Sequence, residues 1–384
     1  MSTPPVIELD GGQQRPLPSE PGGSSNAPQL WLLRIASALV VPGVLVLFFF
    51  AFDFLRQEDT NKIIQVVIAV LVGVGGVWIL YWGMDRAITA MPARAGSAVR
   101  PFAFAGPAIV LLAFYLVYPA VNTFILSFQN STGTEFVGFD NFERIFTQST
   151  YLISMRNSVV WVLFVPAVAV AIGLGFATLA DKLPTKSEAA AKSLIFLPLA
   201  VSFVGASVVW TFVYNFRPEG FGDQIGILNA IGVAFGADPV NWMQVPLWNN
   251  LFLMIILVWL QTGFGMVILS SAIKGVPEDY LEASRIDGAT EWQVFWRIVV
   301  PSIASTIVVV WTTTLITTWK VFDIVYVMTG GGFGTSVVAE RMVTEFFTFN
   351  NDGIGAALAV VLFVAVVPIL VINVRRFREQ EATR

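Results

Sequence analysis

The chain has 384 residues, of which 56% are hydrophobic and only 12% are charged. This apolar share exceeds the roughly 45–50% of ordinary soluble domains and indicates a protein of the lipid bilayer. Neither cysteine nor histidine occurs, which excludes cysteine redox chemistry, histidine-centred triads and the common zinc sites, and the net charge of −4 adds little about topology.

Residues 1–30 are rich in Pro, Gly, Ser and Gln and are expected to form a disordered cytoplasmic tail rather than a cleaved signal. Long runs with few charges follow, and about 20 helical residues are enough to cross a bilayer. We predict an all-α polytopic membrane protein with about eight spans, near residues 35–53, 63–84, 102–125, 157–180, 193–214, 249–272, 302–325 and 354–374.

The first two spans stand apart from the rest, behind the basic segment "DRAITAMPARAGSAVR". We therefore expect residues 31–99 to form a peripheral helix pair and linker, residues 100–378 to form a six-helix core, and residues 379–384 to be a second cytoplasmic tail. Glycines in the second span are expected to allow close helix contact. Fifteen of the 22 basic residues fall on the side that holds both termini and residues 271–300, which places that side in the cytoplasm.

The loops on the other side, near residues 126–156, 215–248 and 326–353, are too short for an extracellular catalytic domain of usual size. One of them contains "FVGFDNFERIF" at residues 136–146, whose spacing predicts a short amphipathic segment at the membrane interface. No G-x-x-x-x-G-K-[ST] run occurs, so we expect no ATPase site and no bound cofactor in this chain.

The cytoplasmic segment Ser271–Val300 is the most polar stretch between two spans. Pro277 and the acidic residues after it predict a short helix that ends near Ile286, followed by a turn at Gly288. A second short helix is expected from Ala289, with a possible capping box and an aromatic face formed by Trp292, Phe295, Trp296 and Val299 that lies on the membrane interface.

Within this segment, Glu282-Ala283-Ser284, then Gly288, then Ile298-Val299-Val300-Pro301 follow the Glu-Ala-Ala, Gly and Ile-x-Leu-Pro pattern of importer permeases of the ATP-binding-cassette type. Residues 100–378 resemble that family, and "FVGFDNF" and "FDIVYVMTGGG" are similar to segments of its maltose-transport type of sugar permease. Phe333 stands where those proteins usually have proline after the glycines.

The resemblance implies that the first helix of the segment docks on a cytoplasmic ATPase subunit. It assigns this coupling role to Glu282, Ala283, Ser284, Arg285, Asp287, Gly288 and Ala289. It further implies a prokaryotic cell membrane, a second homologous permease chain in a heterodimer, two ATPase subunits that bind ATP and Mg, and an extracytoplasmic solute-binding protein.

A polar solute needs hydrogen-bonding groups near the middle of the membrane. The spans that flank the polar segment offer Gln261, Phe264, Thr314, Thr317, Thr318 and Trp319 as substrate-binding candidates. Hydroxyls and an amide beside aromatic rings suit a neutral sugar, although each threonine could instead bond to the carbonyl four residues back. Lys320 and Asp323 are expected to pair at the outer end of the seventh span.

These observations predict the permease subunit of an ATP-driven importer for a disaccharide or α-glucoside such as maltose or trehalose, and not an enzyme. Glycerol phosphates and other oligosaccharides remain alternatives. A secondary transporter would need a buried ion-coupling network, which the spans lack, and a lipid-linked sugar transferase would need paired carboxylates outside the polar segment.

Overall fold

The computed structural model describes residues 43–382, apart from residues 45, 57–60, 90 and 92. Every regular element in this part of the chain is a helix, which confirms the all-α fold class. The expected tail at residues 1–30 and residues 35–42 and 45 of the first predicted span lie outside the described residues; residues 46–53 of that span belong to the helix Val46–Leu55. The chain divides into two compact units, Met1–Tyr118 and Pro119–Arg384.

The first unit contains one long helix made of α2 (Lys62–Val70), the π-helical η1 (Leu71–Gly76) and α3 (Val77–Thr89), followed by α4 (Ala93–Leu112) and η2 (Ala113–Val117). The basic segment is therefore mainly helical. Arg100 of α4 forms an ion pair with Asp85 of α3 at 2.7 Å. Gly76 lies so close to the ring of Phe48 that a Cβ at this position would be 2.9 Å from it, in keeping with a glycine that permits close contact.

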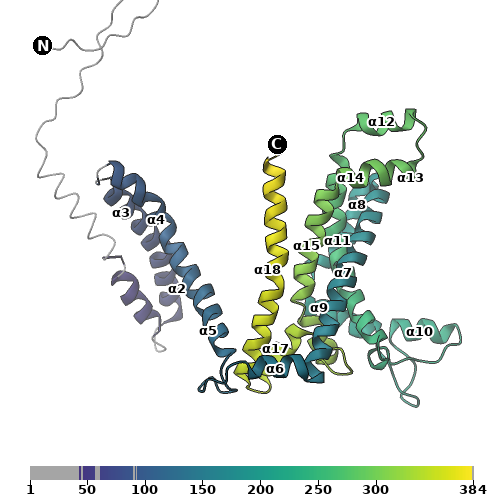
Figure 1. Cartoon of the computed structure of the whole chain (residues 1–384), viewed down its shortest axis with the longest axis horizontal. Coiled ribbons are helices and arrows are strands. Elements are labelled where there is room, and N and C mark those ends of the chain that lie inside the picture. The colour runs from purple at the N-terminus through teal and green to yellow at the C-terminus, as the bar shows by residue number, and fades with distance from the viewer. Residues whose placement is uncertain (1–42, 45, 57–60, 90, 92, 383–384) are drawn as a thin grey trace, which may run out of the picture. The chain divides into compact units, whose positions relative to one another are not determined.

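The second unit holds the remaining elements. They are the end of α5 (Tyr118–Leu126), α6 (Asp140–Thr147), α7 (Ser149–Asp181), α8 (Thr185–Phe196), η3 (Leu197–Ala200), α9 (Phe203–Val213), α10 (Ile227–Ala234), η4 (Trp242–Gln244), α11 (Trp248–Lys274), α12 (Glu278–Ile286), α13 (Glu291–Val294), η5 (Phe295–Val299), α14 (Val300–Ser302), α15 (Ala304–Trp319), α16 (Asp323–Thr329), α17 (Val338–Phe347) and α18 (Asp352–Ala382). Figure 1 shows α12 and α13 at one end of this unit and α6, α10 and α17 at the other.

Five helices among the described residues are long and apolar enough to cross a membrane: Lys62–Thr89, Gly96–Leu126, Ser149–Asp181, Trp248–Lys274 and Asp352–Val371. Two further predicted spans are bent pairs of helices, so this part of the chain has up to seven spans. Residues 193–214 are not one helix, because Thr185–Ala200 and Phe203–Val213 meet at 103°. Pro198 lies in the tight turn before this break, and the Ser202 hydroxyl caps the new helix at the Gly205 N–H, 3.0 Å away.

The predicted span at residues 302–325 is also interrupted. A 70° bend separates Glu291–Ser302 from α15, and α15 itself ends at Trp319. Lys320 caps α15 while Asp323 begins α16, so the two residues are not on one helix as predicted, and no ion pair joins them in the described part of the chain. The change of backbone direction between Trp319 and Asp323 removes the spacing that an uninterrupted helix would have given them.

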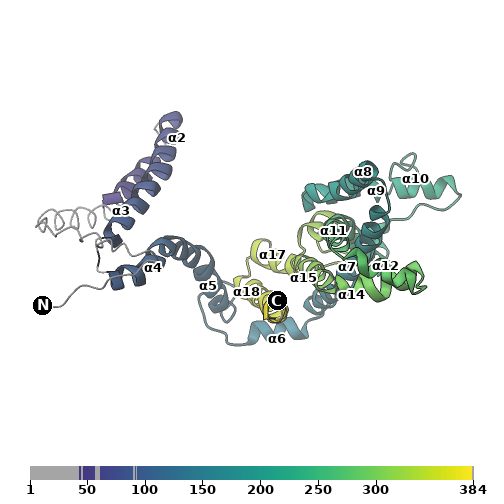
Figure 2. The same ribbon diagram turned by 90° about the horizontal axis from the view of Figure 1, so that it is seen from above.

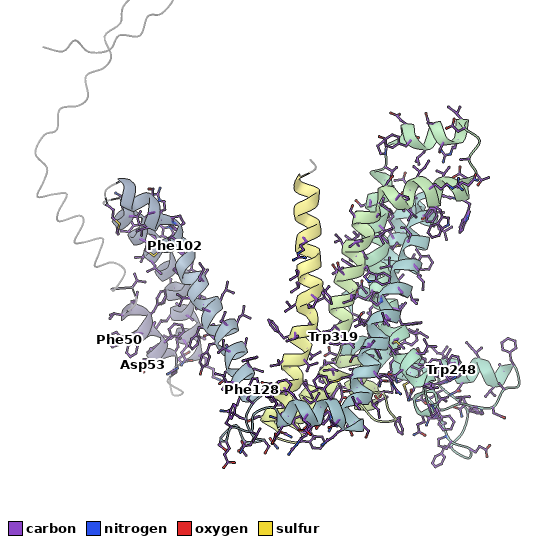
Figure 3. All side chains as sticks on the ribbon, in the orientation of Figure 1. Phe50, Asp53, Phe102, Phe128, Trp248 and Trp319 are labelled. Atoms are coloured by element: carbon purple, nitrogen blue, oxygen red, sulfur yellow. The ribbon has the colours of Figure 1, made fainter. Side chains whose placement is uncertain are left out.

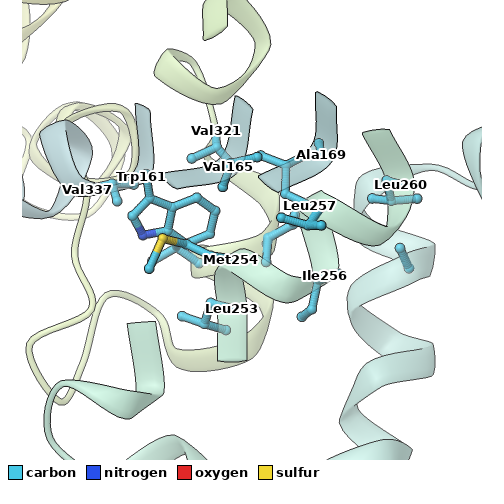
Figure 4. Close-up of a cluster of buried hydrophobic side chains, with 14 of the residues drawn as sticks. Trp161, Val165, Ala169, Leu253, Met254, Ile256, Leu257, Leu260, Val321 and Val337 are labelled. Carbon is cyan, nitrogen blue, oxygen red and sulfur yellow. The ribbon is translucent and has the colours of Figure 1, made fainter. Parts of the chain in front are cut away.

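The core of the second unit is formed by α7, α11 and α15, which lie side by side and are seen nearly end-on in Figure 2. Trp161, Val165, Leu253 and Leu257 are fully buried in the largest cluster of apolar side chains (Figure 4). Gly173 allows α7 to touch α11, since a Cβ there would lie 3.0 Å from the Met266 nitrogen. A second buried cluster, which contains Val170, Met266 and Val310, joins α15 to α7 and α11 and fixes the three helices relative to one another.

Candidate functional site

The polar segment forms two short helices joined by a bend, as the sequence predicts. α12 covers Glu278–Ile286, and Gly288 has φ of +83°, a conformation that glycine adopts without strain. The predicted capping box is present: the Thr290 hydroxyl accepts from the Gln293 N–H at 3.4 Å, and the Gln293 side chain accepts from the Thr290 N–H at 2.8 Å.

The coupling candidates divide between two faces of α12. Glu282 and Ala283 are exposed, whereas Ser284 is buried and donates its hydroxyl to the Leu281 carbonyl at 2.8 Å. Adjacent helical residues point about 100° apart, so of the two small residues Ala283 and Ser284 only Ala283 is exposed on α12. Arg285 closes the bend through its Nε, which lies 2.9 Å from the Glu291 carboxylate.

The same carboxylate raises the pKa of the Arg285 guanidinium, first by hydrogen bonding and then by charge attraction. Arg285 therefore holds α12 and α13 together across the bend. Asp287 and Gly288 lie at the exposed turn, and Ala289 is half-buried beside it. The side chain of Ile286 is 85% exposed, which makes this end of α12 an apolar spot on an otherwise polar surface.

The aromatic face of the second short helix differs from the prediction. Trp292 is exposed and its ring contacts that of Trp296, but Val299 is buried. Phe295–Val299 is a π-helix, whose wider turn moves later residues around the axis relative to an α-helix. Val299 therefore leaves the face that α-helical spacing would have assigned to it.

The mid-span candidates come from α11 and α15. These helices run in opposite directions and contact each other near Gly265, where a Cβ would lie 3.5 Å from the Val310 side chain. Gln261 lies four residues before Gly265 and Thr314 lies four residues after Val310. Because the helices are antiparallel, both are one turn farther from α12 than this contact and lie at the same height along the two helices. Gln261 is 6% exposed and Thr314 is 1% exposed, so a buried amide and a buried hydroxyl lie in the same layer.

The hydroxyl partners distinguish the threonines. Thr317 donates to the Thr313 carbonyl at 3.0 Å, and Thr318 donates to the Thr314 carbonyl at 2.7 Å, as the alternative interpretation predicts. The Thr314 hydroxyl is buried and has no hydrogen-bond partner within the described residues. Among the three candidate threonines, Thr314 is therefore the one whose hydroxyl makes no hydrogen bond within the described residues.

The two aromatic candidates lie in different places. Phe264 is half-buried near the contact between α11 and α15. Trp319 lies at the far end of α15 (Figure 3), where its indole N–H donates to the Leu362 carbonyl of α18 at 3.0 Å. The structure thus brings Gln261, Phe264 and Thr314 to neighbouring levels, and it places Trp319 in the contact with α18.

An ionic cluster next to the polar segment was not predicted. Glu188 of α8 is 7% exposed and accepts from Lys192 of the same helix and from Lys274, the last residue of α11, at 2.8 Å. Lys274 also lies 3.9 Å from Asp181 at the end of α7. The sequence signal was the Glu188–Lys192 spacing of four residues; the Lys274 contact depends on the tertiary fold.

A loop rich in glycine follows α16 at the opposite end of the unit. Asn157 donates to the carbonyls of Gly334 and Ser336 at 2.7 and 2.9 Å, and Asn249 donates to that of Phe333 at 2.8 Å. Phe333 has φ of +54°, whereas a proline ring fixes φ near −65°. The phenylalanine at this position thus allows a backbone conformation that proline could not adopt.

Comparison with known proteins places the chain among transport permeases. Residues 172–380 match the profile of the family described as "Binding-protein-dependent transport system inner membrane component". The chain is 50% identical to the osmoprotective compounds uptake permease GgtC of Synechocystis sp. over 278 residues, which cover 72% of this chain and 99% of that protein. It is 44% identical to the alpha-glucoside transport system permease AglF of Rhizobium meliloti, covering 83% of this chain and 97% of that protein.

Structural comparison gives the same fold. A bacterial ABC transporter involved in the import of the acidic polysaccharide alginate contains a chain that superposes with a TM-score of 0.63. The superposition covers 74% of the present chain and 99% of the other at 19% sequence identity. At this level of sequence identity, the comparison shows that the two chains share a similar arrangement of helices.

Proposed function

The chain belongs to the family of binding-protein-dependent transport system inner membrane components, and from this premise we propose that it forms half of the pathway of an ATP-driven importer for a disaccharide or α-glucoside. The observation that carries the proposal is the 44% identity to an alpha-glucoside permease over 97% of that protein. A multi-pass membrane protein with buried polar groups between apolar helices fits this role.

The α12–α13 segment is the proposed contact with a cytoplasmic ATPase subunit. Its exposed carboxylate at Glu282 can accept charge-assisted hydrogen bonds, and the bend, across which Arg285 pairs with Glu291, can transmit movement to α11. With this segment in the cytoplasm, both termini are also cytoplasmic, in agreement with the excess of basic residues there. A second permease chain, two ATPase subunits that hold ATP and Mg, and a solute-binding protein complete the proposed assembly.

The proposed solute site in the membrane is the layer of Gln261 and Thr314, with Phe264 beside it. An unpaired buried hydroxyl is costly unless a solute or water completes its hydrogen bond. Thr317, Thr318 and Trp319 remain candidate contacts. A small osmoprotective compound is the second candidate solute, because the 50% identical relative takes up such compounds according to its name.

Uptake of labelled maltose and trehalose in a strain that lacks this gene tests the proposal. We expect uptake only when the gene is restored, and only in cells with intact ATP supply. Uptake that persists in membranes without any ATPase subunit would contradict an ATP-driven importer, whereas selective uptake of other osmoprotective compounds would favour the second candidate.

A further inference from the structure

A cavity of about 380 Å³ lies between the first half of α7, the start of α11 and the glycine-rich loop after α16. It is at the end of the second unit away from α12 (Figure 1). Trp161 and Met254 contribute to its wall, and Figure 4 shows them side by side. Its volume is in the range of sites for small ligands.

The polar part of the wall is made of asparagine amides and the Arg156 guanidinium. Asn250 accepts from the Trp161 indole and donates to the Gly334 carbonyl, both at 3.3 Å, and Asn157 donates to the same carbonyl at 2.7 Å. Each amide oxygen has a second lone pair that can accept from a ligand hydroxyl. Arg156 also lines the cavity, where its guanidinium donates to the Asn157 amide oxygen at 3.3 Å, and none of the described lining residues is acidic, which disfavours a cation as the ligand.

The rim carries two large residues in an unfavourable backbone conformation. Leu247 and Phe333 have φ of +70° and +54°, which side chains with a Cβ rarely adopt. Both residues line the cavity and are largely exposed, with 80% and 60% of their surface accessible. Neither feature improves the packing of the chain itself, and strained residues gather at ligand sites.

The cavity and the proposed solute layer lie along the same face of α11. Asn250, Met254 and Gln261 recur at i, i+4 and i+11, so they share one stripe of α11. Eleven residues of helix correspond to about 16 Å. Met254 and Leu257 lie between the cavity and Gln261 on this face and are buried, so a solute that passes along it reaches Gln261 only when these two side chains move.

We propose that this cavity is a second solute subsite, which receives a neutral polyhydroxyl ring before it reaches the Gln261 layer. The apolar face of the ring stacks on Phe333 and Leu247, and its hydroxyls donate to the amides of Asn157 and Asn250. The inference rests on the proposed function, because it takes the transported sugar as the ligand.

Protection of a single cysteine tests the site directly, since the chain contains no cysteine of its own. Phe333→Cys is compared with Phe347→Cys, which replaces a ring that is 79% exposed and does not line the cavity. In the assembled transporter we expect maltose or trehalose to slow maleimide labelling of position 333 at least threefold and to leave position 347 unchanged. Equal labelling with and without sugar, or no labelling of position 333 in either condition, would overturn the subsite.

Uptake kinetics separate this inference from the proposed function. Phe333→Ala is expected to raise the half-saturating sugar concentration three- to tenfold at an unchanged level of protein in the membrane, and Phe333→Tyr is expected to retain the wild-type value. If wild-type cells take up the sugar but Phe333→Ala has the same half-saturating concentration, the proposed subsite is contradicted and the proposed importer function is not. If wild-type cells take up neither sugar, the proposed solute class itself fails, and the protection experiment must then show no effect of these sugars.

Discussion

Gly288 is the residue at which the chain reverses direction between α12 and α13, and its φ of +83° sets the angle of the bend. A residue with a Cβ loses roughly 1–2 kcal/mol in this region of backbone space, and proline cannot enter it. A Cβ at this position would meet no atom within 4 Å beyond its chain neighbours, so the requirement is one of backbone conformation rather than space.

We therefore predict that Gly288→Pro abolishes uptake and stimulated ATP hydrolysis while the chain still reaches the membrane. Gly288→Asn is the matched control, because asparagine tolerates the left-handed region better than other residues with a side chain. Uptake and membrane level are measured together. Normal uptake by the proline variant would contradict the coupling role of this bend.

Thr314 and Thr318 are both 1% exposed, but only the Thr318 hydroxyl has a partner within the helix. Thr314→Val removes an unpaired hydroxyl at nearly constant volume and should leave thermal stability equal or slightly higher. If Thr314 contacts the solute, the same variant should raise the half-saturating solute concentration for uptake severalfold. Thr318→Val, which loses only an intrahelical hydrogen bond, should change uptake less. An equal effect of the two variants would contradict a special role of the Thr314 hydroxyl in solute binding.

At the scale of elements, the sequence predicts which segments are helical better than where each helix stops. Hydropathy shows that a segment has enough apolar residues to cross a membrane, but it does not show the direction of the helix axis. The bends at residues 201–202 and at Ile303 were therefore not predicted. The capping box at Thr290 was predicted because its two hydrogen bonds are local. The π-helical turn at Phe295–Val299 was not, since it depends on how the neighbouring helices pack.

Close backbone contact between α8 and α11 leads to an element-scale prediction. Gly263 lies against α8, and a Cβ there would be 2.5 Å from the carbonyl oxygen of Ile195. Gly263→Ala must therefore push the two helices apart, and we expect a lower thermal stability of the purified transporter and less protein in the membrane. Gly175→Ala is the control, because a Cβ at that helical position meets no atom within 4 Å. Comparable losses for both variants would contradict the packing argument.

At the scale of the whole molecule, the candidate site combines what is local in sequence with what only folding brings together. The α12–α13 segment is contiguous, so its candidate residues could be identified in the sequence from their resemblance to the pattern of importer permeases. Gln261 and Thr314 come from separate helices, and their common level depends on the contact between Gly265 and Val310. The ionic cluster of Asp181, Glu188, Lys192 and Lys274 joins three helices, and only its Glu188–Lys192 pair has a local sequence signal.

This ionic cluster leads to a prediction about coupling between the α12–α13 segment and the transmembrane helices. Lys274 is the last residue of α11 before the segment, and it binds Glu188 of α8, whose helix leads into the 103° bend toward α9. Lys274→Gln should therefore lower the amount of sugar transported per ATP hydrolysed, because the segment can then move without carrying α8. Lys192→Gln is the matched control, since Lys192 pairs with Glu188 within one helix and joins no second element. Uptake and ATP hydrolysis are measured on the same reconstituted vesicles, and an equal ratio for the two variants would mean that Lys274 stabilises the fold without transmitting movement.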